Sequence, residues 1–201
     1  MAILYIKNEI ASAIKLPRKV TIAYCFTAIE KNCRRNMKIS FKNDYSEGCH
    51  PRVLEALTKS NFDQQDGYGL DDFCKNASNI ILQKTRSPKS KVYFVSGGTQ
   101  ANLVVASAFL RPHESVISAK TGHIFDNETG AIEATGHKVN PIEALNGKLT
   151  PDHIQQVIDA HPIKPHQLKQ KMVYISNSTE IGTIYSRKEL QGLWEFCKSK
   201  D

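Results

Sequence analysis

Residues 91–110, KVYFVSGGTQANLVVASAFL, predict a strand, a glycine turn and a helix in that order. The Val92–Val95 segment is a short apolar run rich in β-forming residues, as in the buried strand of a parallel sheet. The pair Gly97–Gly98 ends that run, and Thr99 can cap the helix that follows it. Ala101–Leu110 is apolar on almost every side, so we expect that helix to be buried.

The turn between this strand and helix is a candidate phosphate site. The first N–H groups of a helix have no partner within the helix, and the helix dipole places positive charge beside them. Gly97 and Gly98 allow a close approach of the backbone, and Thr99 adds a hydroxyl donor. The turn has neither the G-x-G-x-x-G pattern of dinucleotide sites nor the G-K-[ST] of P-loops. From these residues alone, a phosphate site and a plain helix start are therefore both open.

Composition and charge favour a globular protein without a nucleic-acid partner. The 201 residues suffice for one domain with a core. The net charge is +7, but residues 1–36 hold seven Lys or Arg and only two Asp or Glu, whereas the rest holds 20 basic and 18 acidic residues. No basic face with interleaved aromatic residues marks this larger part, so we expect no binding to nucleic acid.

The cysteines predict no cross-links and no metal site. Five cysteines are scattered along the chain without a C-x-x-C pair, so neither a disulfide framework nor a zinc site is indicated. Reduced thiols are typical of the cytoplasm, which is the localisation we expect.

Residues 1–36 differ from the rest of the chain. The apolar run Val20–Ile29 follows a basic stretch, but it lacks a convincing cleavage site and is too short to span a bilayer. We therefore expect no membrane partner. We predict a poorly packed extension over residues 1–36 and a folded domain over residues 37–201.

From residue 38 onward, predicted strands and helices alternate, which favours an α/β fold with a parallel sheet. The expected strands are at Ile39–Phe41, Ser115–Ser118 and Met172–Ser176, in addition to Val92–Val95. The expected helices, besides Ala101–Leu110, run from Pro51 through HPRVLEALTKS, over Phe73–Thr85, within His123–Ala134 up to Gly136, from Pro151, and over Ser186–Lys198. A polar glycine-bearing loop is expected at Asp63–Asp72.

Ligands of parallel α/β sheets bind beyond the carboxyl ends of the strands. That edge would bring together Gly97–Thr99, His123 and Asn177–Thr179. A phosphate cradle, an imidazole and a polar cluster on one rim suggest a phosphorylated aromatic cofactor. The plainer alternatives stay open: a locally bonded loop histidine, a surface carboxylate at Glu128, and hydroxyls that only satisfy the backbone of a turn.

Several segments together resemble the low-specificity threonine aldolase and β-eliminating lyase family. They are, in chain order, NDYSEGCHPRVLEAL, GYGLDD, FVSGGTQAN, GHIFDNETGAIEATGHKV, GKLTP and YISNSTEIGTIYSRKEL. Members of this family are fold-type-I enzymes that use pyridoxal 5′-phosphate (PLP). The resemblance covers Lys38 to about Asp201. It implies the large domain of an aspartate aminotransferase-like, PLP-dependent transferase, with a parallel-rich sheet flanked by helices.

The resemblance implies a role for several residues at the cofactor. Gly98 and Thr99 would hold the cofactor phosphate with Gly97 beside them, and His123 would stack on the pyridine ring. Ser178 and Thr179 would lie near that ring.

Other residues would face the substrate. His166 would help to deprotonate the substrate hydroxyl, with His161 as a competing candidate. The substrate-side motif falls at Asn43-Asp44, where Asn43 replaces the family's serine. Tyr68 matches a residue that family dimers present to the neighbouring subunit's site, so a homodimer or homotetramer is implied for the full-length protein.

The activity implied is cleavage of small threonine-like β-hydroxy-α-amino acids to glycine and an aldehyde. The alternatives are β-elimination on the same scaffold and a non-catalytic fragment. The family's H-x-D-G-A-R aspartate, which pairs with the pyridine nitrogen, and its cofactor-binding lysine would follow Asp201. We therefore expect a truncated large domain, with at most weak, non-covalent PLP binding and no threonine cleavage by this chain itself. On its closing helix, Leu190, Leu193 and Trp194 should be partly exposed.

Overall fold

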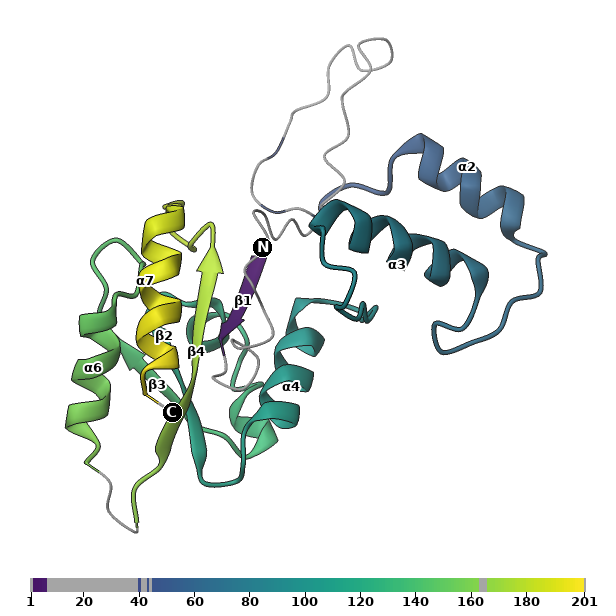
Figure 1. The fold of residues 1–201 in the computed structure, drawn as a ribbon. Coiled ribbons are helices and arrows are strands. Elements are labelled where there is room, and N and C mark those ends of the chain that lie inside the picture. The colour runs from purple at the N-terminus through teal and green to yellow at the C-terminus, as the bar shows by residue number, and fades with distance from the viewer. Residues whose placement is uncertain (1, 7–39, 41–42, 44, 163–165, 201) are drawn as a thin grey trace. The chain divides into compact units, whose positions relative to one another are not determined.

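The computed structural model describes residues 2–6, 40, 43, 45–162 and 166–200 (Figure 1). They divide into two compact units, a helical unit of Ala23–Asn79 and a sheet unit of Met1–Ile22 with Ile80–Asp201. The predicted strand at Ile39–Phe41 and the apolar run Val20–Ile29 lie outside the described residues, apart from Ser40.

Two helices of the amino-terminal half confirm the sequence prediction. Helix α2 (Pro51–Ser60) begins with proline in its first turn, and His50 caps it by accepting from the Arg52 N–H at 3.2 Å. The polar loop follows, and α3 (Asp72–Thr85) begins at its end. Proline fits the first turn because the backbone N–H that it lacks would have no partner there.

The sheet has the order β1-β4-β2-β3 among the described residues. Strands β2 (Glu114–Ala119), β3 (Val139–Ile142) and β4 (Lys169–Asn177) are parallel, with Val116 beside Val139 on one side and Met172 on the other. The predicted strands at Ser115–Ser118 and Met172–Ser176 are therefore confirmed. Strand β3 was not predicted, since its VNPI sequence is short and contains a proline, which strands tolerate mainly at an edge. It lies at the edge of this sheet.

The remaining strand, β1 (Ala2–Ile6), pairs antiparallel with β4, with Tyr5 opposite Tyr174. It belongs to the segment for which the sequence predicted poor packing, and the structure joins these five residues to the sheet. Residues 7–39 lie outside the described part of the chain, so the predicted domain boundary after residue 36 stays a prediction.

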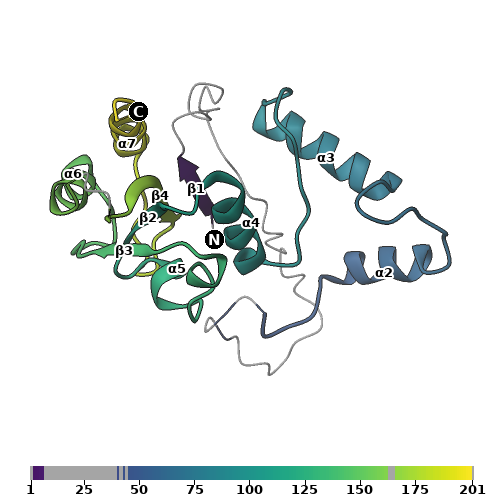
Figure 2. The same ribbon diagram turned by 90° about the horizontal axis from the view of Figure 1, so that it is seen from below.

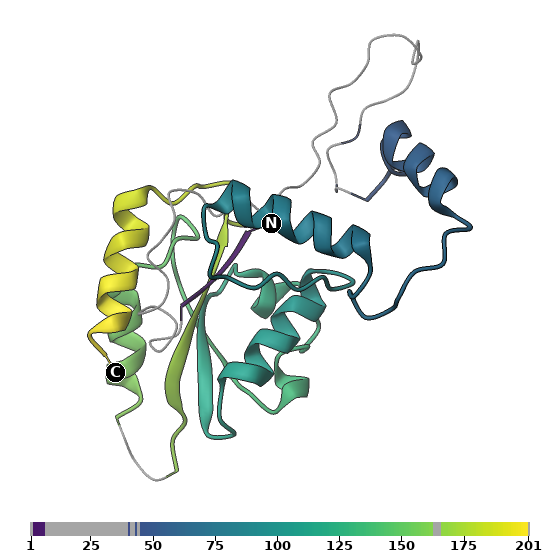
Figure 3. The same ribbon diagram turned by 45° about the vertical axis from the view of Figure 1, so that its right-hand side comes forward.

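Helices cover both faces of the sheet (Figure 2). One face carries α6 (Pro151–Ala160) and α7 (Arg187–Lys198), and the other carries α4 (Gly98–Phe109) and the short α5 (His123–Asp126). Neighbouring residues on β4 point to opposite faces, so Val173 packs toward α6 and α7 and Met172 packs toward α4. Figure 3 shows the same three layers from the side. The expected α/β class is confirmed.

The predicted strand at Val92–Val95 is wrong. Residues 91–95 form neither helix nor strand, and Tyr93, Phe94 and Val95 are exposed at 78%, 50% and 44%. Apolar β-forming residues favour a strand only where a neighbouring strand and a packing face are available. Among the described strands, none pairs with this segment.

The helix after the glycine pair forms, but the prediction of its burial and cap fails. Helix α4 starts at Gly98 with Gly97 as its cap residue, so Thr99 lies inside the first turn and makes no side-chain capping bond. Only Asn102 and Ala106 are fully buried, and Val104 is 52% exposed. One face of α4 covers the sheet, whereas the sequence is apolar all round.

Two further expectations are corrected. The single helix predicted within His123–Ala134 is divided into α5 and a 3-10 turn η1 (Glu133–Thr135), which ends at Gly136 with φ +86° as expected from glycine's freedom there. Leu193 on α7 was expected to be partly exposed but is completely buried against the sheet. Leu190 and Trp194 are half-buried around it.

Candidate active site

The carboxyl ends of β2 and β4 lie side by side, because the two strands are adjacent and parallel. His123 follows the end of β2 and opens α5, whereas Ser178, Thr179 and Glu180 follow the end of β4. The structure thus brings three of the predicted positions to one edge of the sheet, as sequence reasoning expected for a ligand site.

The His123 ring lies between two carboxylates. Its Nδ1 is 3.3 Å from Oε1 of Glu180, and its Nε2 is 3.9 Å from Oε1 of Glu128. The side chain of His123 is 28% exposed, so one part of the ring remains open to solvent. The contacts restrict the ring on both nitrogens without enclosing it.

Glu128 is buried, so the alternative of a surface carboxylate is excluded. Its side chain is 1% exposed, and Oε1 accepts a hydrogen bond from Nδ2 of Asn102 at 2.6 Å. Asn102 lies in the second turn of α4 and is itself buried. Helix α4 therefore holds the carboxylate that lies beside His123.

A second series of hydrogen-bonded side chains leads from β4 to the same histidine. The Ser176 hydroxyl donates to Oε1 of Glu180 at 3.2 Å, and the Tyr174 hydroxyl lies 3.2 Å from Ser176 Oγ. Burial raises the pKa of Tyr174 to about 12, so its phenol stays protonated near neutral pH. These hydrogen bonds connect side chains of β4 to Glu180 at the edge of the sheet.

The amino-terminal turn of α4 is open. Gly97, Gly98 and Thr99 are exposed, and no atom lies within 4 Å of the position that a side chain on Gly97 would take. The first turn has no acidic residue, and the first backbone bond of the helix runs from the Ala101 N–H to the Gly97 carbonyl. The earlier N–H groups therefore have no acceptor within the helix, which suits an anion.

This open turn and the histidine network share one helix. Asn102 follows Thr99 by three residues, a rise of about 4.5 Å along an α-helix. Through its bond to Glu128, Asn102 connects the turn that begins at Gly98 to the carboxylate beside His123.

Thr179 holds a turn in place. Its hydroxyl lies 2.8 Å from that of Thr183 and accepts from the Thr183 N–H at 3.1 Å, while the Thr183 hydroxyl donates to the Asn146 carbonyl. These bonds agree with the plainer alternative of a hydroxyl that satisfies a turn. Ser178 is exposed beside it.

His166 does not join these residues within one chain. It precedes β4, whereas His123 lies at the strand's other end, and a nine-residue strand spans more than about 25 Å. His166 is exposed. The competing His161 also precedes β4 and bonds the Val157 carbonyl from its Nδ1 at 2.9 Å.

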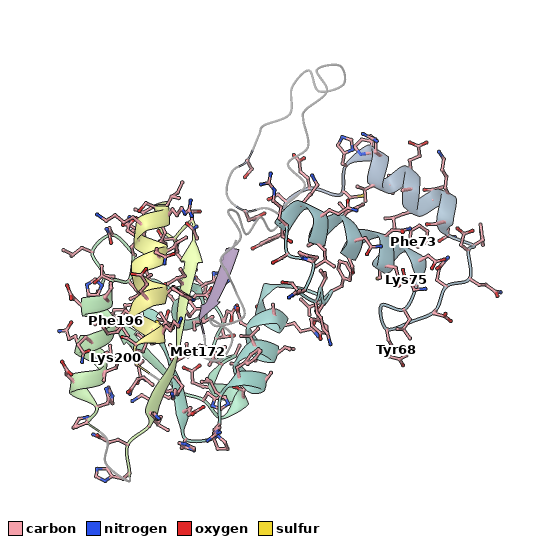
Figure 4. The ribbon with its side chains drawn as sticks, viewed as in Figure 1. Tyr68, Phe73, Lys75, Met172, Phe196 and Lys200 are labelled. Carbon is pink, nitrogen blue, oxygen red and sulfur yellow. The ribbon has the colours of Figure 1, made fainter. Side chains whose placement is uncertain are left out.

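The predicted substrate residues belong to the helical unit. The Asn43 side chain accepts from the Tyr45 N–H at 3.2 Å and from the Ser46 hydroxyl at 2.6 Å, which stabilises a local turn. Tyr68 has φ +61° and is fully exposed in the loop before α3 (Figure 4). Asp44 lies outside the described residues.

Asn102, Glu180 and Ser176 were not predicted. Asn102 could have been found, since it is an amide side chain within the largely apolar Ala101–Leu110 stretch, a position that a buried polar contact would explain. Glu180 and Ser176 had no comparable pattern. In the described part of the chain, no group of three His, Cys, Asp or Glu side chains could hold a metal ion. None of the described helices is long and apolar enough to cross a membrane.

Parallel strands covered by helices on both faces, with an open helix terminus and a histidine at their carboxyl edge, define a three-layer α/β domain of the kind that binds ligands at that edge. The family model for β-eliminating lyases matches residues 53–201, and the chain belongs to that family.

Individual relatives agree with this assignment. The chain is 31% identical to a low-specificity L-threonine aldolase from a Pseudomonas strain and 30% identical to the Pseudomonas aeruginosa enzyme of that name, over 79% of its own length. Its structure is similar to that of a Leishmania major threonine aldolase, with a TM-score of 0.76, 44% identity and 78% of this chain covered. The match spans 46% of the length of each of these proteins.

Proposed function

We propose that this chain forms the cofactor-phosphate and ring-binding part of a PLP-dependent lyase. The reaction proposed is the cleavage of threonine-like β-hydroxy-α-amino acids to glycine and an aldehyde. The observation that carries the proposal is the position of His123, which lies at the carboxyl edge of the sheet and is joined through Glu128 and Asn102 to the open first turn of α4. The similarity to threonine aldolases supports the choice of reaction.

The described residues suit the cofactor. A phosphate group needs convergent N–H donors and no carboxylate nearby. The exposed turn at Gly97–Thr99 has N–H groups unpaired within the helix, and the first turn of the helix contains no acidic residue. An aromatic ring needs a flat, partly open partner, and His123 is 28% exposed. When bound, PLP supplies an electron sink for the bonds at the substrate's α-carbon.

The roles of the protein's own residues follow from this arrangement. Gly97, Gly98 and Thr99 hold the phosphate through backbone N–H groups and the Thr99 hydroxyl. His123 orients the ring by packing on it. Thr179 shapes the turn beside the ring and presents Ser178 at its rim.

His166, Asn43, Asp44 and Tyr68 are proposed to act on the substrate. Because His166 lies at the far end of β4, its proposed proton-transfer role requires a neighbouring subunit. Tyr68, fully exposed, is likewise proposed to reach a neighbour's site in a homodimer or homotetramer. The proposed localisation is the cytoplasm.

The proposed cofactor site is tested by PLP binding to the purified chain, followed by its visible absorbance and by borohydride reduction. We expect PLP to bind and inorganic phosphate to displace it. Pyridoxal without its phosphate should bind more weakly. Failure to bind PLP at all would overturn the proposed site.

The reaction is tested with L-threonine, by measuring glycine and acetaldehyde, and with β-substituted amino acids, by measuring keto acid. Release of acetaldehyde together with glycine supports the aldolase. Keto acid without aldehyde would instead favour β-elimination, the alternative that the family's description suggests.

A further inference from the structure

The network around His123 contains three buried polar atoms without a hydrogen-bond partner among the described residues. They are Oδ1 of Asn102, Oε2 of Glu128, and Nδ1 of His123, which lies 3.3 Å from Oε1 of Glu180 but forms no hydrogen bond with it. Buried polar groups nearly always form hydrogen bonds, so three such atoms in one network indicate a functional role in addition to packing.

Glu128 is the most constrained member of this network. Its carboxylate is 1% exposed and accepts one hydrogen bond, from Asn102. Burial of an ionised carboxylate is costly unless a donor or a positive charge lies close to it. The Nε2 atom of His123 lies 3.9 Å from it, and the buried phenol of Tyr174, which also interacts with Glu128, is a second titratable neighbour.

Glu180 differs from Glu128, although it lies nearer to the ring. Its side chain is 26% exposed, and it follows β4 in a turn where Ser176 donates to it. Solvent weakens the interaction of such a carboxylate with its neighbours. Of the two carboxylates, the one clamped by α4 is better suited to fix the ring.

We propose that Glu128 is a positioning residue that sets the orientation and the proton position of the His123 ring, and that Asn102 holds Glu128 in place from α4. A carboxylate next to one imidazole nitrogen favours the proton on that nitrogen. This proposal rests on the proposed function in one respect, the use of the oriented His123 ring in PLP binding. The positioning of the ring by Glu128 is a property of the chain without PLP.

In this arrangement α4 contributes both to the candidate phosphate site and to the position of Glu128. The first turn of α4 offers N–H groups to a phosphate, and the second turn holds Glu128 through Asn102. A ligand that orders the first turn therefore also orders the carboxylate that sets the ring.

The test uses the ring nitrogens of the histidines, observed by ¹H–¹⁵N NMR in the chain without PLP. His123 is assigned from the signals lost in His123→Gln. In Glu128→Gln we expect the Nδ1 and Nε2 resonances of His123 to shift to a different proton distribution, with the other histidines unchanged. Glu133→Gln is the matched control, because Glu133 is exposed and follows five residues later. Unchanged His123 resonances in a folded Glu128→Gln variant would overturn the proposal.

A second variant covers the case in which Glu128→Gln does not fold. Asn102→Ala leaves the carboxylate in place but removes its clamp, so it should shift the same two His123 resonances. A folded Asn102→Ala variant with parental His123 signals would contradict the role of α4. Because these spectra need no cofactor, loss of PLP binding with an intact dependence of His123 on Glu128 would count against the proposed function alone.

Discussion

The backbone N–H of Leu149 donates a hydrogen bond of 2.6 Å to the hydroxyl oxygen of Tyr185. The bond joins the segment before α6 to the segment before α7, 36 residues later, and both residues are buried. Burial also raises the pKa of Tyr185 to about 12. The two helices on one face of the sheet are therefore connected at their starts, next to the turn that contains Thr179.

Replacement of Tyr185 by phenylalanine should destabilise the sheet unit. The change keeps the ring but leaves the Leu149 N–H buried without an acceptor, which costs about 1–3 kcal/mol. Urea unfolding of the variant would measure the loss. Tyr93→Phe is the control, since Tyr93 is 78% exposed, and it should leave the midpoint unchanged. Equal midpoints for Tyr185→Phe and the parent protein would show that the bond contributes nothing.

Sequence reasoning was most successful where local chemistry and burial agree. The prolines that open α2 and α6, the serine and glutamate that cap α7, and the apolar residues within β2 and β4 each favour an element through short-range interactions. The edge of the sheet that carries His123 followed from the parallel arrangement of these strands.

The failures have a common physical cause, because they depend on partners distant in the sequence. Val92–Val95 has the composition of a strand but no neighbouring strand among the described residues. The burial of Glu128 depends on Asn102, 26 residues earlier, and no local pattern reveals that contact.

The phosphate role of the first turn of α4 predicts the effect of two substitutions. Thr99→Ala removes one charge-assisted hydrogen bond, worth about 1.5–3 kcal/mol, so it should weaken PLP binding by roughly 10- to 100-fold. Gly98→Val should prevent the close approach of the phosphate. Equilibrium titration with PLP measures both, with Thr58→Ala on α2 as the control. Parental affinity in both variants would exclude this turn as the phosphate site.

Gly147 should be less tolerant of a side chain than Gly182, although both have positive φ angles of 70° and 86°. An alanine at either site is strained by about 1–2 kcal/mol in this conformation. At Gly147 the added Cβ would also lie 3.2 Å from side-chain atoms of Thr179 and Ile181, whereas at Gly182 it would meet no atom within 4 Å. Urea unfolding should therefore show a larger loss for Gly147→Ala. Equal losses of unfolding free energy would show that Thr179 and Ile181 move away from the added methyl group without cost.

Cys197 should react far more slowly with an alkylating reagent than Cys49. Burial on α7 raises the pKa of the Cys197 thiol to about 11, and the residue is 7% exposed, whereas Cys49 is exposed. Only the thiolate reacts, and burial reduces both its population and its accessibility. Iodoacetamide labelling at pH 8, followed by mass spectrometry of peptides, should modify Cys49 first. In denaturant the two rates should become similar. Similar rates in the native protein would mean that α7 is not packed as described.

The contact between Glu189 and Lys148 predicts how stability depends on pH. The hydrogen bond from Lys148, together with the Ser186 contacts of the α7 cap, lowers the pKa of Glu189 to about 2 from an ordinary value of 4.5. A group whose pKa is lower in the folded state stabilises the fold above its unfolded pKa, and that contribution disappears as the pH falls through the folded value. Glu189→Gln keeps a side chain able to cap α7 but removes the charge. Its deficit in unfolding free energy should therefore be full above about pH 5 and should shrink as the pH falls toward 2. Glu195→Gln, an exposed change on the same helix, is the control, and a deficit for Glu189→Gln that stays constant between pH 7 and pH 3 would contradict the electrostatic origin of the effect.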